Sequence, residues 1–198
     1  MSMFHELMMR KKEQIMYATI KGSLTESPYG VFSGFSESNY LALQEPFAPT
    51  GSWEIVTKIT TGNSLINNVK YFLGNFDSER SLIVGTTDNP ITTFKAFIST
   101  NGGVSFNIQL ISTVEAQTNT EYYIRVGFTG TTYYLDFSTD GINYVGRAEY
   151  SSTSKISPYI LYYGRVFSSG NLWNGSIDLN NSYIKLGSTK YKIVAVPE

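Results

Sequence analysis

The sequence predicts an all-β fold, either a sandwich or a barrel. Apolar and polar residues alternate over many short segments, and turn residues separate these segments roughly every ten residues. Beyond Asn39 no long stretch has helical period. The composition, with 15 Tyr, 12 Phe and many Ser, Thr, Asn and Gly, is typical of strands joined by tight turns. At 198 residues, the chain is the size of one domain.

The predicted strands follow one another along the chain. The first long strand is the clearest, because Trp53, Ile55 and Ile59 fall on one face of it and Glu54 and Lys58 on the other. In order, the predicted segments are Asn39–Gln44, Ser52–Gly62, Val69–Phe76, Arg80–Thr87, Phe94–Asn101, Val104–Ser112, Glu121–Gly130, Thr132–Asp140, Ile142–Tyr150, Ile156–Arg165, Trp173–Leu179 and Ser182–Gly187.

One hairpin can be placed in register from its residues. With Gly130 and Thr131 as a two-residue loop, three apolar pairs share one face, and an ion pair lies on the other. The apolar pairs are Phe128 with Tyr133, Val126 with Leu135 and Ile124 with Phe137; on the other face Arg125 meets Asp136 and Tyr123 lies near Ser138. A slip of one residue would destroy both sets of pairs, so the sequence specifies this register.

Residues 1–19 differ from the rest and are predicted to be an N-terminal anchoring or docking segment, helical or extended, before a domain at residues 20–198. Phe4, Leu7 and Met8 fall near helical spacing, and all five methionines of the chain lie here. A frayed tail or a helix that covers the domain is the alternative. The segment lacks the pattern of a signal peptide, and no apolar run approaches the roughly 20 residues that cross a bilayer.

Several function classes are disfavoured by the composition. The formal net charge is −1 and the one basic cluster is residues 10–12, which argues against nucleic-acid binding. There is no cysteine, and the single histidine, His5, lies in the N-terminal segment, so the domain offers neither a serine triad nor a histidine-based metal centre. The residues Asp77, Asp88 and Asn89 do not have the spacing of a calcium loop. We therefore predict no metal and no cofactor.

The carboxylates do not predict an enzyme. Glycoside hydrolysis needs two carboxylates at a set separation, whereas the acidic residues on the predicted strands are isolated from one another: Glu54, Asp136, Glu149 and Asp178. Two segments, Ile98–Phe106 and Phe137–Tyr144, are similar to the Asp-box, Ser-x-Asp-x-Gly-x-x-aromatic. We interpret their Asn101 and Asp140 as turn-forming residues that bond nearby backbone amides.

The most specific ligand site that the sequence suggests is the second face of the hairpin. Tyr123, Arg125, Tyr134 and Asp136 share that face. We expect that a sugar ring can stack on tyrosine there while its hydroxyls bond the charged groups. The alternative is an exposed cross-strand ion pair without a function.

Three segments resemble the concanavalin A-like lectin/glucanase superfamily in its laminin-G-like jelly-roll form, and the likeness spans about Gly22 to Lys192. They are GVFSGFSESNYLAL, similar to an entry strand, SWEIVTKITTG, similar to the first long core strand, and LWNGSIDLNNSYIKLG, similar to the closing strand pair. The resemblance implies an antiparallel two-sheet jelly-roll sandwich. In the closing pair, Ile177 and Leu179 point inward, Asn180 and Asn181 make the turn, and Trp173 packs at a sheet edge.

Cysteine-free domains of this form are similar to those of tailed-bacteriophage structural proteins. The resemblance implies a non-catalytic virion surface protein, attached to other virion proteins through its N-terminal segment, that binds a cell-surface glycan as a homo-oligomer. It carries over neither catalytic nor metal-binding residues, because the superfamily's Glu-x-Asp-x-Glu run is missing. A glycan-processing enzyme of the same fold and a structural cementing protein without a ligand are the alternatives.

Overall fold

The computed structural model describes residues 13–63, 69–75, 81–87, 92–165 and 172–198. These residues form fifteen strands and no helix, so the all-β prediction is confirmed, and they contain no helix that could cross a membrane. The strands are β1 (Gln14–Lys21), β2 (Thr25–Glu26), β3 (Val31–Ser33), β4 (Tyr40–Leu43), β5 (Trp53–Thr60), β6 (Lys70–Gly74), β7 (Leu82–Thr87), β8 (Thr93–Ile98), β9 (Ile108–Glu115), β10 (Glu121–Phe128), β11 (Thr132–Ser138), β12 (Val145–Ser151), β13 (Tyr162–Tyr163), β14 (Ser176–Leu186) and β15 (Thr189–Val196). His5, the basic cluster at residues 10–12, and Asp77, Asp88 and Asn89 lie outside the described residues.

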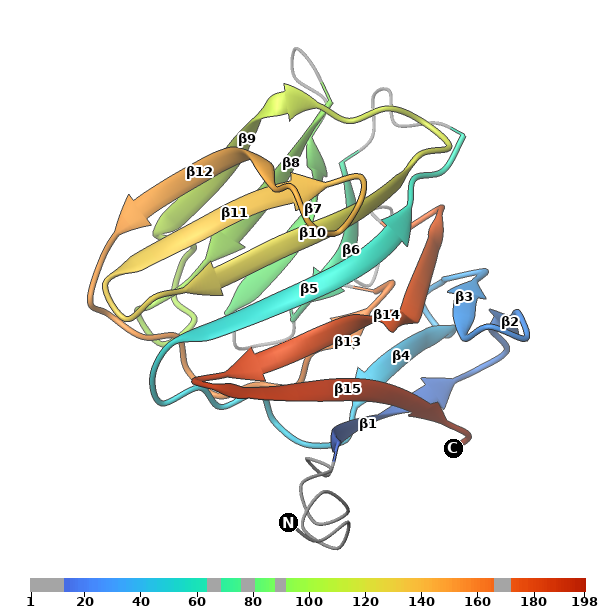
Figure 1. Ribbon diagram of the computed structural model, residues 1–198. Helices are drawn as coiled ribbons and strands as arrows, with labels where there is room; N and C mark the ends of the chain where they lie inside the picture. The colour runs from blue at the N-terminus through green and yellow to red at the C-terminus, as the bar shows by residue number, and fades with distance from the viewer. Residues whose placement is uncertain (1–12, 64–68, 76–80, 88–91, 166–171) are drawn as a thin grey trace, which may run out of the picture.

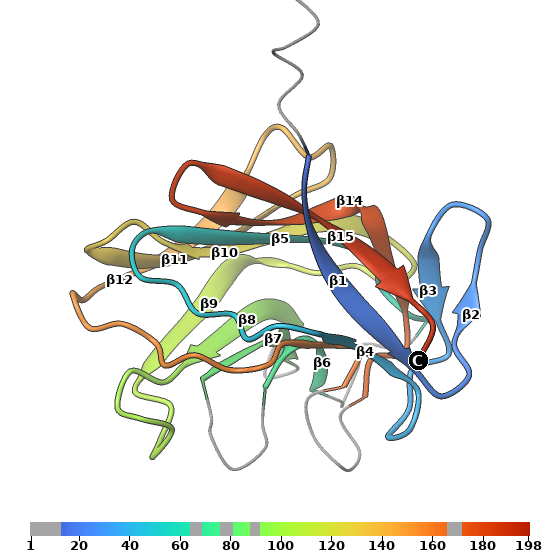
Figure 2. The same cartoon turned by 90° about the horizontal axis from the view of Figure 1, so that it is seen from below.

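The strands form one continuous sheet with the order β12-β11-β10-β5-β14-β15-β1-β4-β13-β6-β7-β8-β9, with β2 and β3 attached beside β14 (Figure 1). Seen from below, the two halves of this sheet lie over one another as facing layers, and β1 passes from one to the other (Figure 2). At the far end β9 lies against β12, so the sheet nearly closes on itself. Two separate sheets are therefore not confirmed, because the hydrogen-bonded ladder is unbroken.

Strand β1 belongs to the sheet. It pairs with β15 in parallel from Gln14 to Thr19 and with β4 in antiparallel orientation from Ala18 to Lys21. Helical spacing of the apolar residues does not persist here, because pairing on both sides stabilises extended backbone instead. An appendage is thus not confirmed for residues 14–19, which the sequence placed outside the domain. Antiparallel pairing holds for every other pair of named strands in the described part of the chain.

The core lies between the two layers. Strand β5 contributes Trp53, Ile55 and Ile59, all buried, as its alternation predicts. Trp173 is also in this core, with 1% of its surface exposed and its ring centroid 5.2 Å from that of Phe72. The prediction that it packs at a sheet edge is therefore wrong. Burial of so large an aromatic side chain stabilises the core by more than an edge position would.

The hairpin β10–β11 has the register that the sequence specifies. All five predicted pairs are confirmed, from Phe128 opposite Tyr133 to Tyr123 opposite Ser138. The Thr129 amide donates to the Thr132 carbonyl at 2.9 Å across the two-residue loop, and Gly130 has a φ of 110°. That value falls in the region that glycine adopts without strain.

The segment Asn180–Asn181 is a bulge and not a turn. Strand β14 continues through it and pairs with β5 on both sides, with Asp178 opposite Lys58 and Tyr183 opposite Val56. The Ser182 hydroxyl holds the bulge closed, because it accepts from the Lys58 amide at 2.9 Å and donates to the Asp178 carbonyl at 2.6 Å. Ile177 and Leu179 point inward as expected.

The two segments that are similar to Asp-boxes form turns. The Asp140 carboxylate accepts from the Ser138 hydroxyl at 2.7 Å and from the amides of Ile142 and Asn143 at 2.8 Å each. Asn101 accepts in the same way from the Ser99 hydroxyl at 2.8 Å. Their interpretation as turn-forming residues agrees with these contacts.

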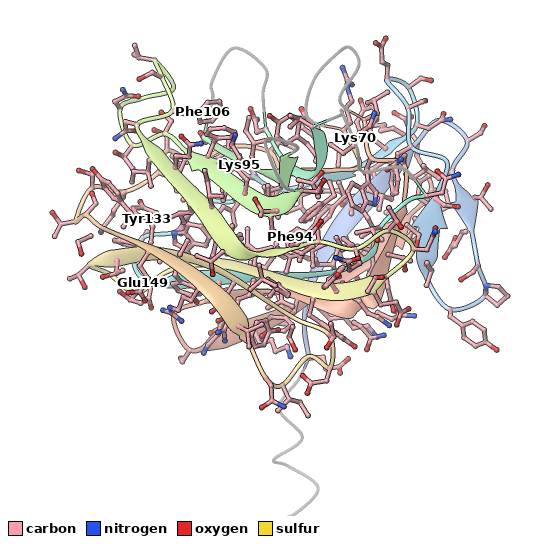
Figure 3. The ribbon with its side chains drawn as sticks, turned by 90° about the horizontal axis from the view of Figure 1, so that it is seen from above. Lys70, Phe94, Lys95, Phe106, Tyr133 and Glu149 are labelled. Carbon is pink, nitrogen blue, oxygen red and sulfur yellow. The ribbon has the colours of Figure 1, made fainter. Side chains whose placement is uncertain are left out.

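The second layer presents its own outer face. Phe94 points between the layers, while Lys95, the next residue of β8, lies on the outer side near Phe106 (Figure 3). A small apolar cluster covers this face, built on the buried side chains of Tyr71 and Ile83.

The contacts of Asp140 predict a pH dependence of stability. Bonds from Ser138 and from the amides of Asn143 and Ile142 hold the pKa of Asp140 below its ordinary value of 3.8. The carboxylate therefore stabilises the fold above pH 3.8, and this contribution is lost as the pH falls further. We expect Asp140→Asn to keep the fold, and the stability gap between wild type and variant to be wider at pH 6 than at pH 2.5. Urea unfolding at both values measures the gap, and an equal gap at both would contradict this account.

The position of β1 predicts where the chain tolerates truncation. A chain that begins at Glu13 keeps every described strand, so we expect it to unfold cooperatively with the full-length midpoint. A chain that begins at Ile20 lacks the residues that pair with β15, and we expect it to lose cooperative unfolding. Circular dichroism during thermal denaturation distinguishes the two. Equal midpoints for both truncated chains would show that β1 is dispensable.

Candidate ligand-binding groove

A groove with a volume of about 770 Å³ lies on the outer face of the layer that contains β5, β10, β14 and β15. Its size is within the range of small-molecule sites. Tyrosines from three places in the sequence line it: Tyr123 of β10, Tyr144 after the Asp140 turn, and Tyr183 of β14. This layer faces the viewer in Figure 1, and the loop at residues 139–144 rises from its outer side in Figure 2.

Under one side of the groove lies an ion-pair network. The Arg125 guanidinium donates two bonds of 2.7 Å to Asp136, one to each carboxylate oxygen. Arg147 adds a bond of 3.3 Å to the same carboxylate and one of 2.5 Å to Glu149. Asp136 is 1% exposed, so two guanidinium groups compensate a buried charge. The hydrogen bonds from Arg125 to Asp136 raise the pKa of Arg125, which therefore stays cationic.

Glu54 contacts both the ion-pair network and a tyrosine that lines the groove. One of its carboxylate oxygens accepts from the Tyr134 hydroxyl and the other from the Tyr183 hydroxyl, each at 2.9 Å. Burial raises the pKa of both tyrosines, and the negative charge of Glu54 raises it further. Both hydroxyls therefore remain protonated and keep donating, which fixes the Tyr183 ring as part of the groove wall.

Tyr144 is positioned by its contact with Arg125. The guanidinium carbon lies 3.8 Å from the centroid of the Tyr144 ring, a close cation–π arrangement. Burial raises the pKa of Tyr144 to about 12. The turn at Asp140 positions Tyr144, because the Asp140 carboxylate accepts from the backbone amides of Ile142 and Asn143, the two residues before Tyr144.

The bulge of β14 builds another part of the groove. Asn181 bonds the Asp178 carboxylate through both its amide nitrogen, at 3.1 Å, and its side chain, at 2.8 Å. Lys58 lies 3.3 Å from the same carboxylate. With the bulge held this way, Asn180, Asn181 and Ser182 line the groove with polar groups.

The four residues predicted from the sequence fall at different depths on this face. Tyr123 lines the groove, and Arg125 lies beneath Tyr144. Tyr134 and Asp136 are buried in the network, where the Arg147 guanidinium carbon lies 4.3 Å from the Tyr134 ring centroid. All four side chains point away from the core, but Tyr134 and Asp136 are buried beneath the surface and are not exposed on it.

Sequence reasoning missed Tyr144, Tyr183 and the bulge. A signal existed for Tyr183, since alternation with the buried Ile184 places it on the outer face. The bulge could not be predicted from the sequence, because an Asn pair between two strand segments is also typical of a turn.

The chemistry available in the groove is polar and aromatic. Glu54 and Asp136, two carboxylates near the groove, are engaged by tyrosine hydroxyls or guanidinium groups, and Glu13 lines the groove itself. Among the described residues no group of three or more His, Asp or Glu is placed to hold a metal ion. Flat tyrosine rings beside amides and hydroxyls suit a ligand that stacks and forms hydrogen bonds.

The network predicts the cost of losing its central carboxylate. Asp136→Ala leaves Arg125 without its bidentate partner, so we expect the free energy of unfolding to fall by about 2–4 kcal/mol. Asp136→Asn keeps one acceptor and should cost roughly half as much. Urea denaturation measures both changes, with Glu149→Ala, an exposed partner of Arg147, as the control. A loss below about 1 kcal/mol for Asp136→Ala would mean that the buried pair contributes no more than a surface one.

Comparison with known proteins gives structural likenesses alone, since no family model and no curated protein matches the sequence. The enzymatically active domain of tailspike protein 2 from bacteriophage CBA120 is similar in structure, with a TM-score of 0.59 and 12% identity. That likeness covers 91% of this chain and 30% of the tailspike chain, so this chain spans less than a third of it.

Two further solved structures match over most of both chains. The CBM2 module of the evolved Dit of Lactobacillus casei BL23 phage J-1 has a TM-score of 0.53 at 9% identity, over 84% of this chain and 80% of that one. The exoplasmic/lumenal domain of VIP36, in its Ca²⁺/Man3GlcNAc-bound form, has a TM-score of 0.51 at 10% identity, over 81% and 83%. At these identities the likeness establishes the fold. The chain has the concanavalin A-like, jelly-roll fold of lectin-type domains, which bacteriophage proteins also contain.

Proposed function

We propose that this protein is a non-catalytic carbohydrate-binding component of a bacteriophage particle, which recognises a glycan through the groove on β5, β10, β14 and β15. The observation that carries the proposal is the set of three tyrosines around one groove, two of which are fixed by contacts beneath them. Tyr183 is held by Glu54 and Tyr144 by Arg125. Rings that are already ordered lose little entropy when a sugar stacks on them.

The structural likenesses support a carbohydrate ligand. The J-1 phage protein is described as a CBM2 module and the VIP36 domain holds Man3GlcNAc, and both have the fold of this chain. Two of the likenesses are to phage proteins, which supports a place in the virion, exposed to the host surface. In this proposal residues 1–12, which precede β1, attach the domain to other virion proteins, and several copies assemble together.

A binding role is favoured over catalysis by the contacts of Glu54 and Asp136, the carboxylates beneath the tyrosines. A glycosidase keeps one carboxyl group protonated to serve as an acid and a second one free to act on the sugar or on water. Here Asp136 is held by two arginines, and both oxygens of Glu54 accept from tyrosines. The tailspike domain described as enzymatically active is more than three times as long as the part that this chain matches.

The proposal predicts that Tyr144→Ala removes glycan binding without unfolding the protein. The ring is half-buried and stands on a loop, so we expect a small change in melting temperature. Loss of a stacking ring at the centre of the site should weaken binding at least about tenfold. The measurement is the affinity for the tightest ligand on an array of bacterial polysaccharides, followed by calorimetry.

Tyr150→Ala serves as the matched control, because Tyr150 is an exposed tyrosine on β12 opposite the core residue Tyr133 and is not part of the groove. We expect it to leave the affinity unchanged. Equal effects of the two variants would place the site elsewhere. Release of reducing sugar from a bound polysaccharide would favour an enzyme, and a wild-type protein that binds nothing on the array would favour a structural protein without a ligand.

A further inference from the structure

The hairpin of β14 and β15 carries three lysines on the outer face, beside the groove. Lys185 and Lys190 are directly opposite one another in the ladder, and Lys192 is opposite Tyr183. Like charges in opposing positions destabilise a strand pair. This hairpin keeps such a pair at the edge of the groove, where Lys190 and Lys192 are lining residues.

These lysines have no carboxylate partner in the described part of the chain. The ion pairs found there use Lys21, Lys58, Arg125 and Arg147. Glu54 is opposite Lys185 across the β5–β14 ladder, but its oxygens accept from Tyr134 and Tyr183 instead.

The balance of charge in the groove is positive. Among its lining residues Glu13 is the acidic one, against Lys190 and Lys192. The Lys190 ammonium lies 3.7 Å from the centroid of the Tyr183 ring, which holds the charge against the groove wall. The ring uses none of the ammonium's three N–H donors as a conventional hydrogen bond, so these donors remain for a ligand.

We propose that the ligand of this groove is an acidic glycan, whose carboxylate, phosphate or sulfate groups bind Lys190 and Lys192 while its sugar rings stack on the tyrosines. This inference rests on the proposed function and deepens it. An anion beside Lys190 and Lys192 forms charge-assisted hydrogen bonds and also relieves the repulsion between Lys190 and Lys185. A neutral glycan can accept hydrogen bonds from the lysines, but it does not compensate their charge.

The test compares two double variants with the same change of charge. Lys190→Gln with Lys192→Gln removes two positive charges from the groove, and Lys21→Gln with Lys155→Gln removes two from elsewhere, so the formal net charge of each falls from −1 to −3. Both are assayed with the wild type on an array of neutral polysaccharides (dextran, mannan) and acidic ones (polygalacturonate, teichoic acid, heparin). The tightest ligand is then titrated at 50 and 500 mM NaCl.

We expect the wild type to bind acidic members of the array, and to bind at least tenfold more weakly at 500 mM NaCl because salt screens the contact. The groove variant should lose at least tenfold in affinity at low salt and the control variant less than twofold. The melting temperature of the groove variant should not fall, since a repulsive pair is removed. Which acidic polysaccharide binds then identifies the anionic group.

Each other outcome counts against the inference in a distinct way. Tight binding to dextran or mannan that is unchanged in the groove variant would overturn the acidic ligand but leave the carbohydrate-binding function intact. Binding to an acidic polysaccharide with equal losses in both variants would overturn the assignment to Lys190 and Lys192. Failure of the wild type to bind any member would overturn the proposed function itself.

Discussion

The pairing of β1 on both of its edges is the constraint on which the rest of the fold depends. On one side β1 pairs with the last strand of the chain, and on the other it pairs with β4, which belongs to the second layer. Ala18 takes part in both ladders and is fully buried there. Because this one strand joins the layers, the facing halves that enclose the core are parts of one hydrogen-bonded sheet, and the first and last strands of the described chain lie side by side.

That arrangement also decides which surface is available for a ligand. The core takes every inward residue of β5, β10 and β11, so the charged residues of these strands are forced onto the outer face. There they pair with one another, because a guanidinium or carboxylate that is half-buried needs a partner. The bulge in β14 lies beside this network and forms one side of the groove. The extra residues of β14 between Asp178 and Tyr183 include Asn180, Asn181 and Ser182, which line the groove on that side.

The sequence predicts a strand correctly where apolar and polar residues alternate strictly, and it predicts a register where the two strands are neighbours in the sequence. The register of β10 and β11 followed from Arg125 and Asp136, because a single slip separates the charges and exposes three apolar pairs. Strand β1 could not be found in this way, since its Ile15 and Met16 fit a helical period as well as an extended one. Strand β15 was not among the predicted strands, although three β-branched residues near its end, Ile193, Val194 and Val196, are typical of a strand.

The candidate site was predicted in part for the same reason. Alternation places Tyr123 and Arg125 on the correct face, but it cannot say which residues of that face are covered by their neighbours. Asp136 is buried because Arg147 approaches from β12, a contact that depends on a shift of register between Leu135 and Phe137. The groove itself combines residues from β10, the Asp140 loop and the β14–β15 hairpin, which are brought together by long-range pairing alone.

On the outer face, the charged residues that stabilise the fold and the residues that are available to a ligand lie in different places. Its centre is electrostatically satisfied, since each carboxylate of the network has donors and each of its arginines has an acceptor or a ring. A ligand gains little by competing with such contacts, because it would have to replace short, charge-assisted bonds that are already formed. The hairpin of β14 and β15 is the opposite case, with lysines that repel one another beside exposed polar groups. In the described part of the chain Lys190 and Lys192 have no carboxylate partner, so an anionic ligand over Tyr183 gains the ion pairs that the protein does not form there.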